Sequence, residues 1–246
     1  MIEKYGVISQ MEELNDNIHD ETRKPRSDGA QSRERLLLTA QRLFAEQGFA
    51  PTSTREIALA AGTNVASISY YFGDKAGLYR AAFRELAPCP RKDVAAFTDP
   101  HASLRESLAA FYAMLLGQLK QGDQQRLSMR LWFREMLEPT GLWLDEIDNG
   151  IRPAHAGLVQ VLGRHLGAAA PADDVARLAF AVVGMAIHLM ISRDVVEQLT
   201  PQLLANESAI DTWSERLVDY AEAMVNAEKA RMESAAQKTQ PRKKKA

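Results

Sequence analysis

The sequence predicts an all-α protein in which an amino-terminal three-helix helix-turn-helix domain is followed by a helical bundle. Apolar residues recur at helical spacing along most of the 246 residues, and no stretch shows a convincing strand pattern. A glycine separates two short helical segments between positions 53 and 72. The composition agrees with a folded chain, because 46% of the residues are apolar, which is ample for a buried core.

The two short helices meet at Gly62. Ser53 or Thr54 can cap the first of them, and Ile57 lies on its apolar face. The second helix is expected over residues 65–72 and has small and polar residues on its outer face. Such a helix fits against base edges and phosphates, because bulky side chains would hold it out of the major groove.

A longer amphipathic helix is expected before this pair, from Ser32 to Gly48, and another after it, from Lys75 until Pro88 ends it. The net charge is −2, but residues 31–80 hold six Lys and Arg against four Asp and Glu. This local positive excess coincides with the helix-turn-helix, as attraction to phosphates requires. Because the excess is small, we expect DNA binding to need a dimer and neutral phosphate contacts.

The string around the glycine turn is more specific than the turn itself. It reads TREIA at 54–58, AG at 61–62, YYFGDK at 70–75 and LY at 78–79. Over residues 32–80 the chain resembles the amino-terminal domain of the tetracycline-repressor (TetR) family of bacterial regulators. The later stretch RLWFREMLEPTG is similar to the CecR-like subgroup. The resemblance implies a sequence-specific transcriptional regulator, with a ligand-responsive repressor acting as a homodimer on an inverted-repeat operator as the expected form.

The resemblance also implies roles for individual residues of the helix-turn-helix. The position matching Thr54 caps its helix and touches a phosphate, and the one matching Arg55 lies near the DNA backbone or the groove. The recognition helix opens with base-facing positions, and two later positions hold phosphates, the second at the start of the next helix. The predicted DNA-binding set is Thr54, Arg55, Val65, Ala66, Ser67, Ser69, Tyr70, Tyr71 and Lys75.

Ser69 departs from the family pattern. Most members carry a tyrosine there, so a usual phosphate or base contact is absent or made by a shorter hydroxyl, and a relative's operator does not transfer. Among the aromatic residues that follow, Phe72 and Tyr70 are expected to pack, although Tyr70 stays in the DNA-binding set. Tyr71 is expected to reach DNA with its hydroxyl from a packed ring.

The rest of the chain is expected to form an effector and dimerisation bundle. Its helices are predicted over residues 103–119, 126–137, about 140–166 with a kink near Pro153, 173–199 and 207–228. The expected organisation is a disordered arm over 1–30, the DNA-binding domain over 31–80, the ligand-binding and dimerisation domain over 81–228, and a basic disordered tail over 229–246.

Two bundle helices are candidates for a two-fold interface. Residues 175–190 are apolar nearly all round with small residues interspersed, and the last helix carries Trp213 and Tyr220 on one stripe. The family resemblance implies that this pair of helices forms a homodimer. It would place two recognition helices about one DNA turn, roughly 34 Å, apart or slightly more.

A small-molecule effector is the second expected partner. Aromatic and methionine residues at helical spacing are more often plain core, but the resemblance to a family with an effector cavity favours a binding site. The candidate lining residues are Phe111, Met114, Leu115, Trp132, Phe133, Met136, Trp143, Met185 and His188. Of the neighbouring charges Arg130, Arg134 and Glu135, at least two are expected to face solvent. Glu135 and Glu138, three residues apart, are expected to face solvent as a pair.

Catalysis is not expected. None of the five histidines follows a glutamate by three residues, as a di-metal bundle site requires, and the strings typical of nucleotide-binding proteins, zinc proteases and hydrolases do not occur. No catalytic residue, metal ligand or cofactor is predicted. The alternative is an architectural DNA-binding dimer without an effector. The sequence is compatible with repression and with activation, and it identifies neither the operator nor the effector.

The amino terminus has no apolar signal core and the chain no run of 18 apolar residues, so we expect a cytoplasmic protein without a membrane partner. Arg23, Lys24 and Arg26 either follow the minor groove or belong to a solvated arm. The tail from Lys229, with seven basic residues and one acidic, either tethers DNA or is solvated. The single Cys89 excludes an internal disulfide and is expected to be a spectator.

Overall fold

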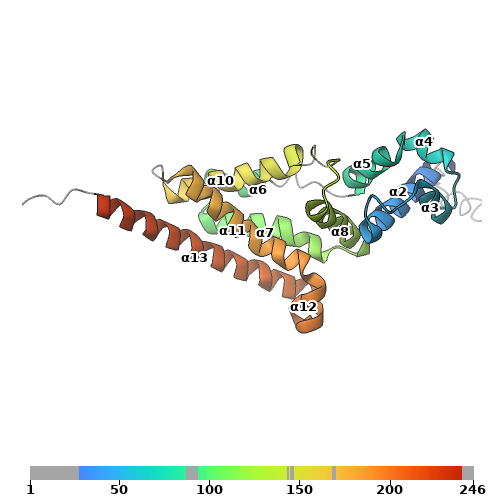
Figure 1. The fold of residues 1–246 in the computed structure, drawn as a ribbon. Coiled ribbons are helices and arrows are strands. Elements are labelled where there is room, and N and C mark those ends of the chain that lie inside the picture. The colour runs from blue at the N-terminus through green and yellow to red at the C-terminus, as the bar shows by residue number, and fades with distance from the viewer. Residues whose placement is uncertain (1–27, 87–93, 143, 145–146, 168–169, 240–246) are drawn as a thin grey trace, which may run out of the picture.

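The protein is an elongated array of helices, seen in a computed structural model that describes residues 28–86, 94–142, 144, 147–167 and 170–239 (Figure 1). A small domain lies at one end, a helical bundle at the other, and helix α8 between them. Every regular element in this described part is a helix, which confirms the all-α prediction. The expectations for Arg23, Lys24, Arg26 and Cys89 lie outside the described residues.

The small domain consists of α2 (Asp28–Gln47), α3 (Thr54–Ala60), α4 (Ala66–Phe72) and α5 (Lys75–Leu86). Helix α2 begins four residues before the expected Ser32. Its apolar stripe packs on the inner faces of the three shorter helices. We call the resulting cluster the amino-terminal core; its buried members are Leu36, Leu37, Ala40, Leu43, Phe44, Ala45, Ile57, Ala58, Ala61, Ile68, Leu78, Tyr79, Ala82, Phe83 and Leu131.

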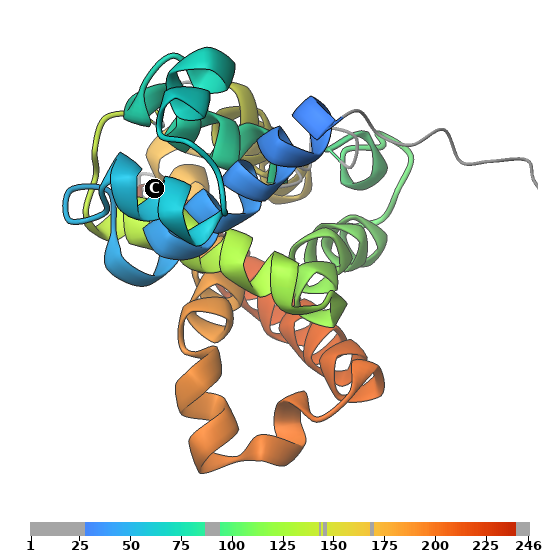
Figure 2. The ribbon, with the colours of Figure 1, turned by 90° about the vertical axis from the view of Figure 1, so that its right-hand side faces the viewer.

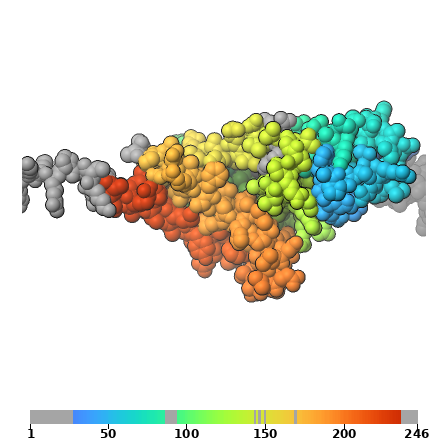
Figure 3. Space-filling model, viewed as in Figure 1, coloured from blue at the N-terminus to red at the C-terminus, as the bar shows by residue number. Residues whose placement is uncertain are grey.

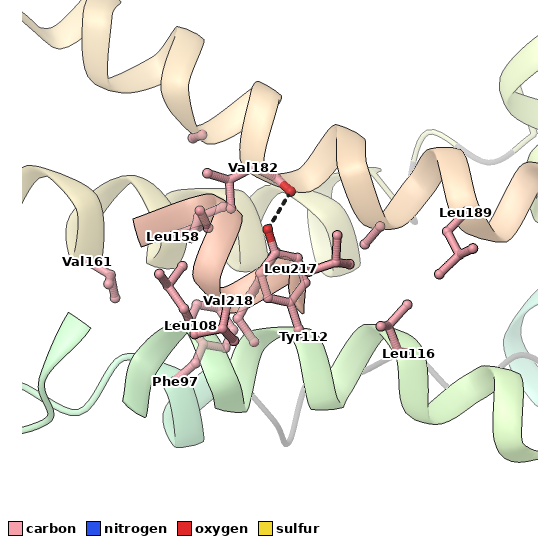
Figure 4. Packing of buried hydrophobic residues seen from close by; sticks show 14 of the residues in the cluster. Phe97, Leu108, Tyr112, Leu116, Leu158, Val161, Val182, Leu189, Leu217 and Val218 are labelled. Carbon is pink, nitrogen blue, oxygen red and sulfur yellow. Dashed lines mark hydrogen bonds between the residues drawn. The ribbon is translucent and has the colours of Figure 1, made fainter. Parts of the chain in front are cut away.

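The bundle contains the remaining elements. They are α6 (Val94–Phe97), α7 (Leu104–Leu116), the 3-10 helix η2 (Gly117–Lys120), α8 (Asp123–Leu137), the π-helix η3 (Ile147–Ile151), α10 (Arg152–Leu166), α11 (Ala172–Ile191), α12 (Arg193–Leu199), the 3-10 helix η4 (Pro201–Leu204) and α13 (Glu207–Thr239). A second cluster, the bundle core, joins α6, α7, α10, α11 and α13 (Figure 4). At its centre the buried Tyr112 hydroxyl donates to the carbonyl oxygen of Val182 at 2.9 Å.

The later bundle helices differ from the expected ones in three places. The kink predicted near Pro153 is the π-helical turn that ends at Ile151, and Pro153 lies in the first turn of α10, where a missing N–H costs nothing. The helix expected over 173–199 breaks at Ser192, so α12 projects from the bundle (Figure 2). Helix α13 runs to Thr239 instead of ending near residue 228.

The extension of α13 has a local cause. Met232 packs against the bundle core, and Arg231 forms an ion pair with Asp174 of α11 at 2.7 Å. Residues 229–239, expected as part of a disordered tail, are therefore helical. The end of α13 lies at the opposite end of the molecule from α4 (Figure 1). A tether from this end would have to reach past the whole length of its own protomer.

Helix α11 is long and apolar enough to cross a membrane by length and composition, which the sequence-based expectation did not foresee. Its first turn carries Asp173 and Asp174, and seven of its side chains are buried in the bundle. Core helices of globular proteins share these properties. One apolar face of α11 stays uncovered, with Phe180 67% and Ile191 47% exposed, and α11 lies on the face seen in Figure 3.

The junction of α4 and α5 requires Gly77. A Cβ atom at this position would lie 2.0 Å from the carbonyl oxygen of Phe72, a backbone atom that cannot move aside. We expect Gly77→Ala to destabilise the small domain by roughly 1–3 kcal/mol, since overpacking forces backbone shifts. Thermal unfolding followed by circular dichroism measures the loss. The control is Gly117→Ala, where a Cβ meets nothing within 4 Å, and an equal fall in both variants would contradict the close approach.

Candidate functional site

The helix-turn-helix begins with a well-formed cap. The Glu56 backbone N–H donates to the Ser53 hydroxyl at 3.1 Å, and the Ser53 N–H donates to the Glu56 carboxylate at 3.5 Å. This reciprocal pair satisfies two N–H groups that the helix leaves free. The cap of α3 is therefore Ser53, and the expectation that Thr54 caps it is wrong. Thr54 is instead the first helical residue, half-buried, and Arg55 beside it is exposed.

The turn and one buried side chain orient α4. Gly62 adopts φ +64°, a region that favours glycine, and the Asn64 side-chain oxygen accepts from the Ala66 N–H at 2.9 Å. Ile68 is buried in the amino-terminal core, so the opposite side of α4 points outward. The outward residues are Val65, Ala66, Ser69 and Tyr70, with Ser67 half-buried beside them.

The three aromatic residues of α4 separate by position. Tyr70 is 83% exposed, so the expectation that it packs is wrong; two residues after the buried Ile68, it falls on the outer side of the helix. Tyr71 packs against the amino-terminal core, and its hydroxyl reaches α2, where a Cβ on Gly29 would be 3.2 Å away. Phe72 packs as expected, with the Arg33 guanidinium 5.0 Å from its ring centre.

Lys75 lies at the start of α5 and is held in place. Its Nζ donates to the carbonyl oxygen of Ala50 at 3.3 Å and lies 4.4 Å from the centre of the Phe49 ring. Partial burial lowers the pKa of Lys75. An ammonium has three N–H donors, so this arrangement leaves donors for an anion next to the positive end of a helix.

The acidic residues of this domain do not neutralise the cations of the helix-turn-helix. Glu56 belongs to the cap of α3, and the Asp74 carboxylate accepts from the Gly77 N–H at 2.6 Å in the first turn of α5. Within the described ranges, no carboxylate forms an ion pair with Arg55 or Lys75. The outer side of α3 and α4 thus combines uncompensated positive charge with small side chains and hydroxyls. This combination suits a DNA groove and its phosphates.

The predicted effector-binding residues do not form one lining. Phe111 lies in the bundle core, and Met114, Leu115, Phe133 and Met185 pack against it. The other members lie elsewhere: Trp132 packs against the amino-terminal core, Met136 and His188 are exposed, and Trp143 lies outside the described residues. Trp132 and Phe133 separate because α8 has one side in each core.

One cleft of about 440 Å³ opens between α7 and α13. Its walls are charged and polar, and none of the predicted effector residues lines it. The lining residues are Arg105, Ala109, Ser214, Glu215, Arg216, Val218 and Asp219.

Glu135 is a residue whose importance the sequence reasoning missed. It is completely buried, whereas Arg130 and Glu138 are exposed as expected. The Tyr79 hydroxyl of α5 donates to Glu135 Oε2 at 2.6 Å, and burial together with this carboxylate raises the pKa of Tyr79 well above its usual range. The signal was helical spacing: Ser128, Leu131 and Glu135 follow one face of α8, and all three are buried.

Comparison with known proteins agrees with this geometry. A family model described as bacterial regulatory proteins of the TetR family matches residues 36–82, and one described as the C-terminal domain of the HTH-type transcriptional dual regulator CecR matches residues 104–228. CecR of Shigella flexneri is 28% identical over 179 residues, which cover 68% of this chain and 79% of that protein. BetI of Paraburkholderia phymatum is 26% identical over 181 residues, covering 71% and 90%.

Solved structures share the fold. NalD, the secondary repressor of the MexAB-OprM efflux pump in Pseudomonas aeruginosa, superposes with a TM-score of 0.58 at 18% identity, covering 80% of this chain and 98% of NalD. A regulator from Saccharomonospora viridis in complex with choline gives a TM-score of 0.54 at 22% identity, covering 78% and 96%. The two family models together span both halves of the molecule. The chain therefore belongs to the TetR family of DNA-binding transcriptional regulators and carries a CecR-type carboxy-terminal domain.

Proposed function

We propose that this regulator is a ligand-responsive repressor that acts in the cytoplasm as a homodimer on an inverted-repeat operator. The observation that carries the proposal is the outer side of α3 and α4. There exposed small and hydroxyl residues lie beside Arg55 and Lys75, which no described carboxylate neutralises. Catalysis has no part in it, in keeping with relatives that are regulators.

Each residue of the DNA-binding set has a proposed role. Thr54, Arg55, Tyr71 and Lys75 contact phosphates and fix the register of the domain on the duplex. The outer residues of α4 meet the base edges. Because Ser69 replaces the usual tyrosine, the neighbouring exposed Tyr70 supplies an aromatic hydroxyl at a shifted position. The residues proposed to contact the bases are then Val65, Ala66, Ser67, Ser69 and Tyr70.

The proposed dimer joins the uncovered faces of α11 and α13. Phe180 and Ile191 of α11 and Tyr220 of α13 are 67%, 47% and 51% exposed, which is unusual for large apolar side chains that follow helical stripes. A two-fold axis through these faces gives four helices in one interface. It places two copies of α4 about one DNA turn, roughly 34 Å, apart or slightly more.

The proposed effector is a small molecule held in the bundle by Phe111, Met114, Leu115, Phe133 and Met185. The fold neighbour from Saccharomonospora viridis was solved with choline, which supports small-molecule binding in such a bundle. Binding would shift the population toward a dimer whose recognition helices no longer match successive major grooves.

An architectural dimer without an effector is the second candidate. It is favoured by the filled bundle core, where the Phe111 ring lies 5.2 Å from that of Phe97 and the Tyr112 hydroxyl is satisfied. A thermal-shift screen separates the two candidates. A compound that raises the melting temperature and releases DNA supports the repressor. A melting temperature that no compound raises supports the architectural dimer.

The experiment that tests the proposal is selection of genomic fragments by the purified protein. The proposal expects the bound fragments to share one inverted repeat. Recovery of fragments with no common site would sink the claim of sequence-specific regulation.

Lys75→Ala is expected to weaken binding to all sequences alike, because it removes a phosphate contact and not a base contact. The slope of log affinity against log salt should fall by about one per half-site. Fluorescence anisotropy at several salt concentrations measures this slope. Lys120→Ala is the control, since Lys120 forms an ion pair with Asp211 in the helical bundle and not in the helix-turn-helix. An unchanged slope in Lys75→Ala would remove Lys75 from the interface.

Phe180→Glu is expected to convert the dimer to monomers, because it places a charge in the proposed apolar interface. Sedimentation velocity gives the mass directly, and operator binding should fall with the dimer. The matched control is Leu137→Glu, because Leu137 of α8 is 74% exposed yet lies off the α11 and α13 faces. A Phe180→Glu protein that remains dimeric would place the interface elsewhere.

A further inference from the structure

We propose that Glu135 is a positioning residue that sets which half-site spacing the dimer accepts, by holding the DNA-binding domain in one orientation on α8. The inference rests on the proposed function, because spacing has meaning only for two recognition helices on one operator. Its basis is a chain of hydrogen bonds, centred on the buried Glu135 carboxylate, that connects the two domains.

The chain of hydrogen bonds runs from α5 through α8 into the segment after it. Glu135 Oε2 accepts from the Tyr79 hydroxyl at 2.6 Å. Glu135 Oε1 accepts from both the backbone N–H and the hydroxyl of Thr140, each at 2.8 Å. The Thr140 hydroxyl in turn accepts from the Leu142 N–H at 3.1 Å. Glu135 is the one charged side chain that is buried among the described residues.

Directional bonds restrict the domain orientation more than apolar contacts do. The apolar contacts of Leu131 in the amino-terminal core have no preferred direction, whereas a hydrogen bond weakens steeply when its length or angle changes. A buried carboxylate that loses a donor also pays the cost of desolvation. A rotation of the small domain about α8 would change the length and the angle of the bond between Tyr79 and Glu135.

Three further bonds hold the same helix to α2, one of them from the Gln124 side-chain amide to the Gln41 side-chain oxygen. The Gln41 side-chain amide donates to the Ser128 hydroxyl at 2.7 Å, and the Arg134 guanidinium donates to the carbonyl oxygen of Glu46 at 3.1 Å. These bonds join α8 to α2, whereas the bond from Tyr79 joins α8 to α5. Glu135 therefore supplies the contact that keeps the small domain from pivoting on α2.

The orientation of α5 determines that of the recognition helix α4, because the two helices are in close contact. Gly77 of α5 lies so close to the Phe72 carbonyl of α4 that a single Cβ would clash. Helix α4 therefore moves with α5. Restraining Tyr79 restrains the helix that enters the groove.

DNA geometry converts this restraint into spacing specificity. Each base pair added between half-sites moves one of them about 3.4 Å along the axis and turns it by roughly 35°. Domains held in one orientation can follow only one spacing. Domains that pivot can follow several, so loosening the bond should flatten the preference.

The test compares Tyr79→Phe with Tyr112→Phe on the inverted repeat selected by the wild-type protein. Both changes remove one buried hydroxyl that makes one hydrogen bond, but only Tyr79 joins two domains. Fluorescence anisotropy at one salt concentration gives the affinity ratio between the selected spacer and spacers one base pair longer or shorter. We expect a ratio of about tenfold or more for wild type and Tyr112→Phe, and of about threefold or less for Tyr79→Phe.

Circular dichroism checks that each variant is folded. If Tyr79→Phe does not fold, Glu135→Gln replaces it, because an amide of the same shape cannot accept from all three donors. A wild-type preference that the folded variant retains would overturn the inference and leave the proposed function intact. A wild-type protein that selects no repeat at any spacing would overturn both.

Discussion

The position of the recognition helix depends on how α8 packs into the amino-terminal core. Leu131 of α8 is a buried member of that core, and Trp132 packs against it. Glu135, one turn further on, bonds to Tyr79 of α5. Physically α8 is thus a fifth helix of the DNA-binding domain, although it belongs to the bundle by its place in the chain.

The same helix is also part of the bundle. Met129 lies in the bundle core and Phe133 packs against it, two residues on either side of Leu131. Neighbouring side chains on one rigid helix therefore belong to two different cores. A change of packing around Phe133 has to move either α8 or its neighbours, and a moved α8 carries Tyr79 and α5 with it. This is a physical path by which a bound molecule in the bundle would change DNA binding.

Helical spacing, glycine turns and cap residues predicted the fold class and most helices, because these signals are local. Long-range partners explain what the sequence left out. Glu135 was expected to face solvent, because a hydrogen bond from a tyrosine 56 residues away leaves no signal in the neighbouring sequence. Trp132 was expected in the effector lining for the same reason. Tyr70 was misplaced for a different reason: it was expected to pack as one of three consecutive aromatic residues, although helical spacing from Ile68 puts it on the outer side of α4.

If α8 holds the two DNA-binding domains at a preset separation, the distance between them in the dimer is fixed and can be measured. Spin labels at Leu38→Cys, on the exposed side of α2 and in a Cys89→Ser background, report the separation in the dimer by pulsed electron resonance. We predict one narrow distance distribution that is the same in the free and the operator-bound dimer. A broad distribution in the free dimer that narrows only on DNA would contradict it.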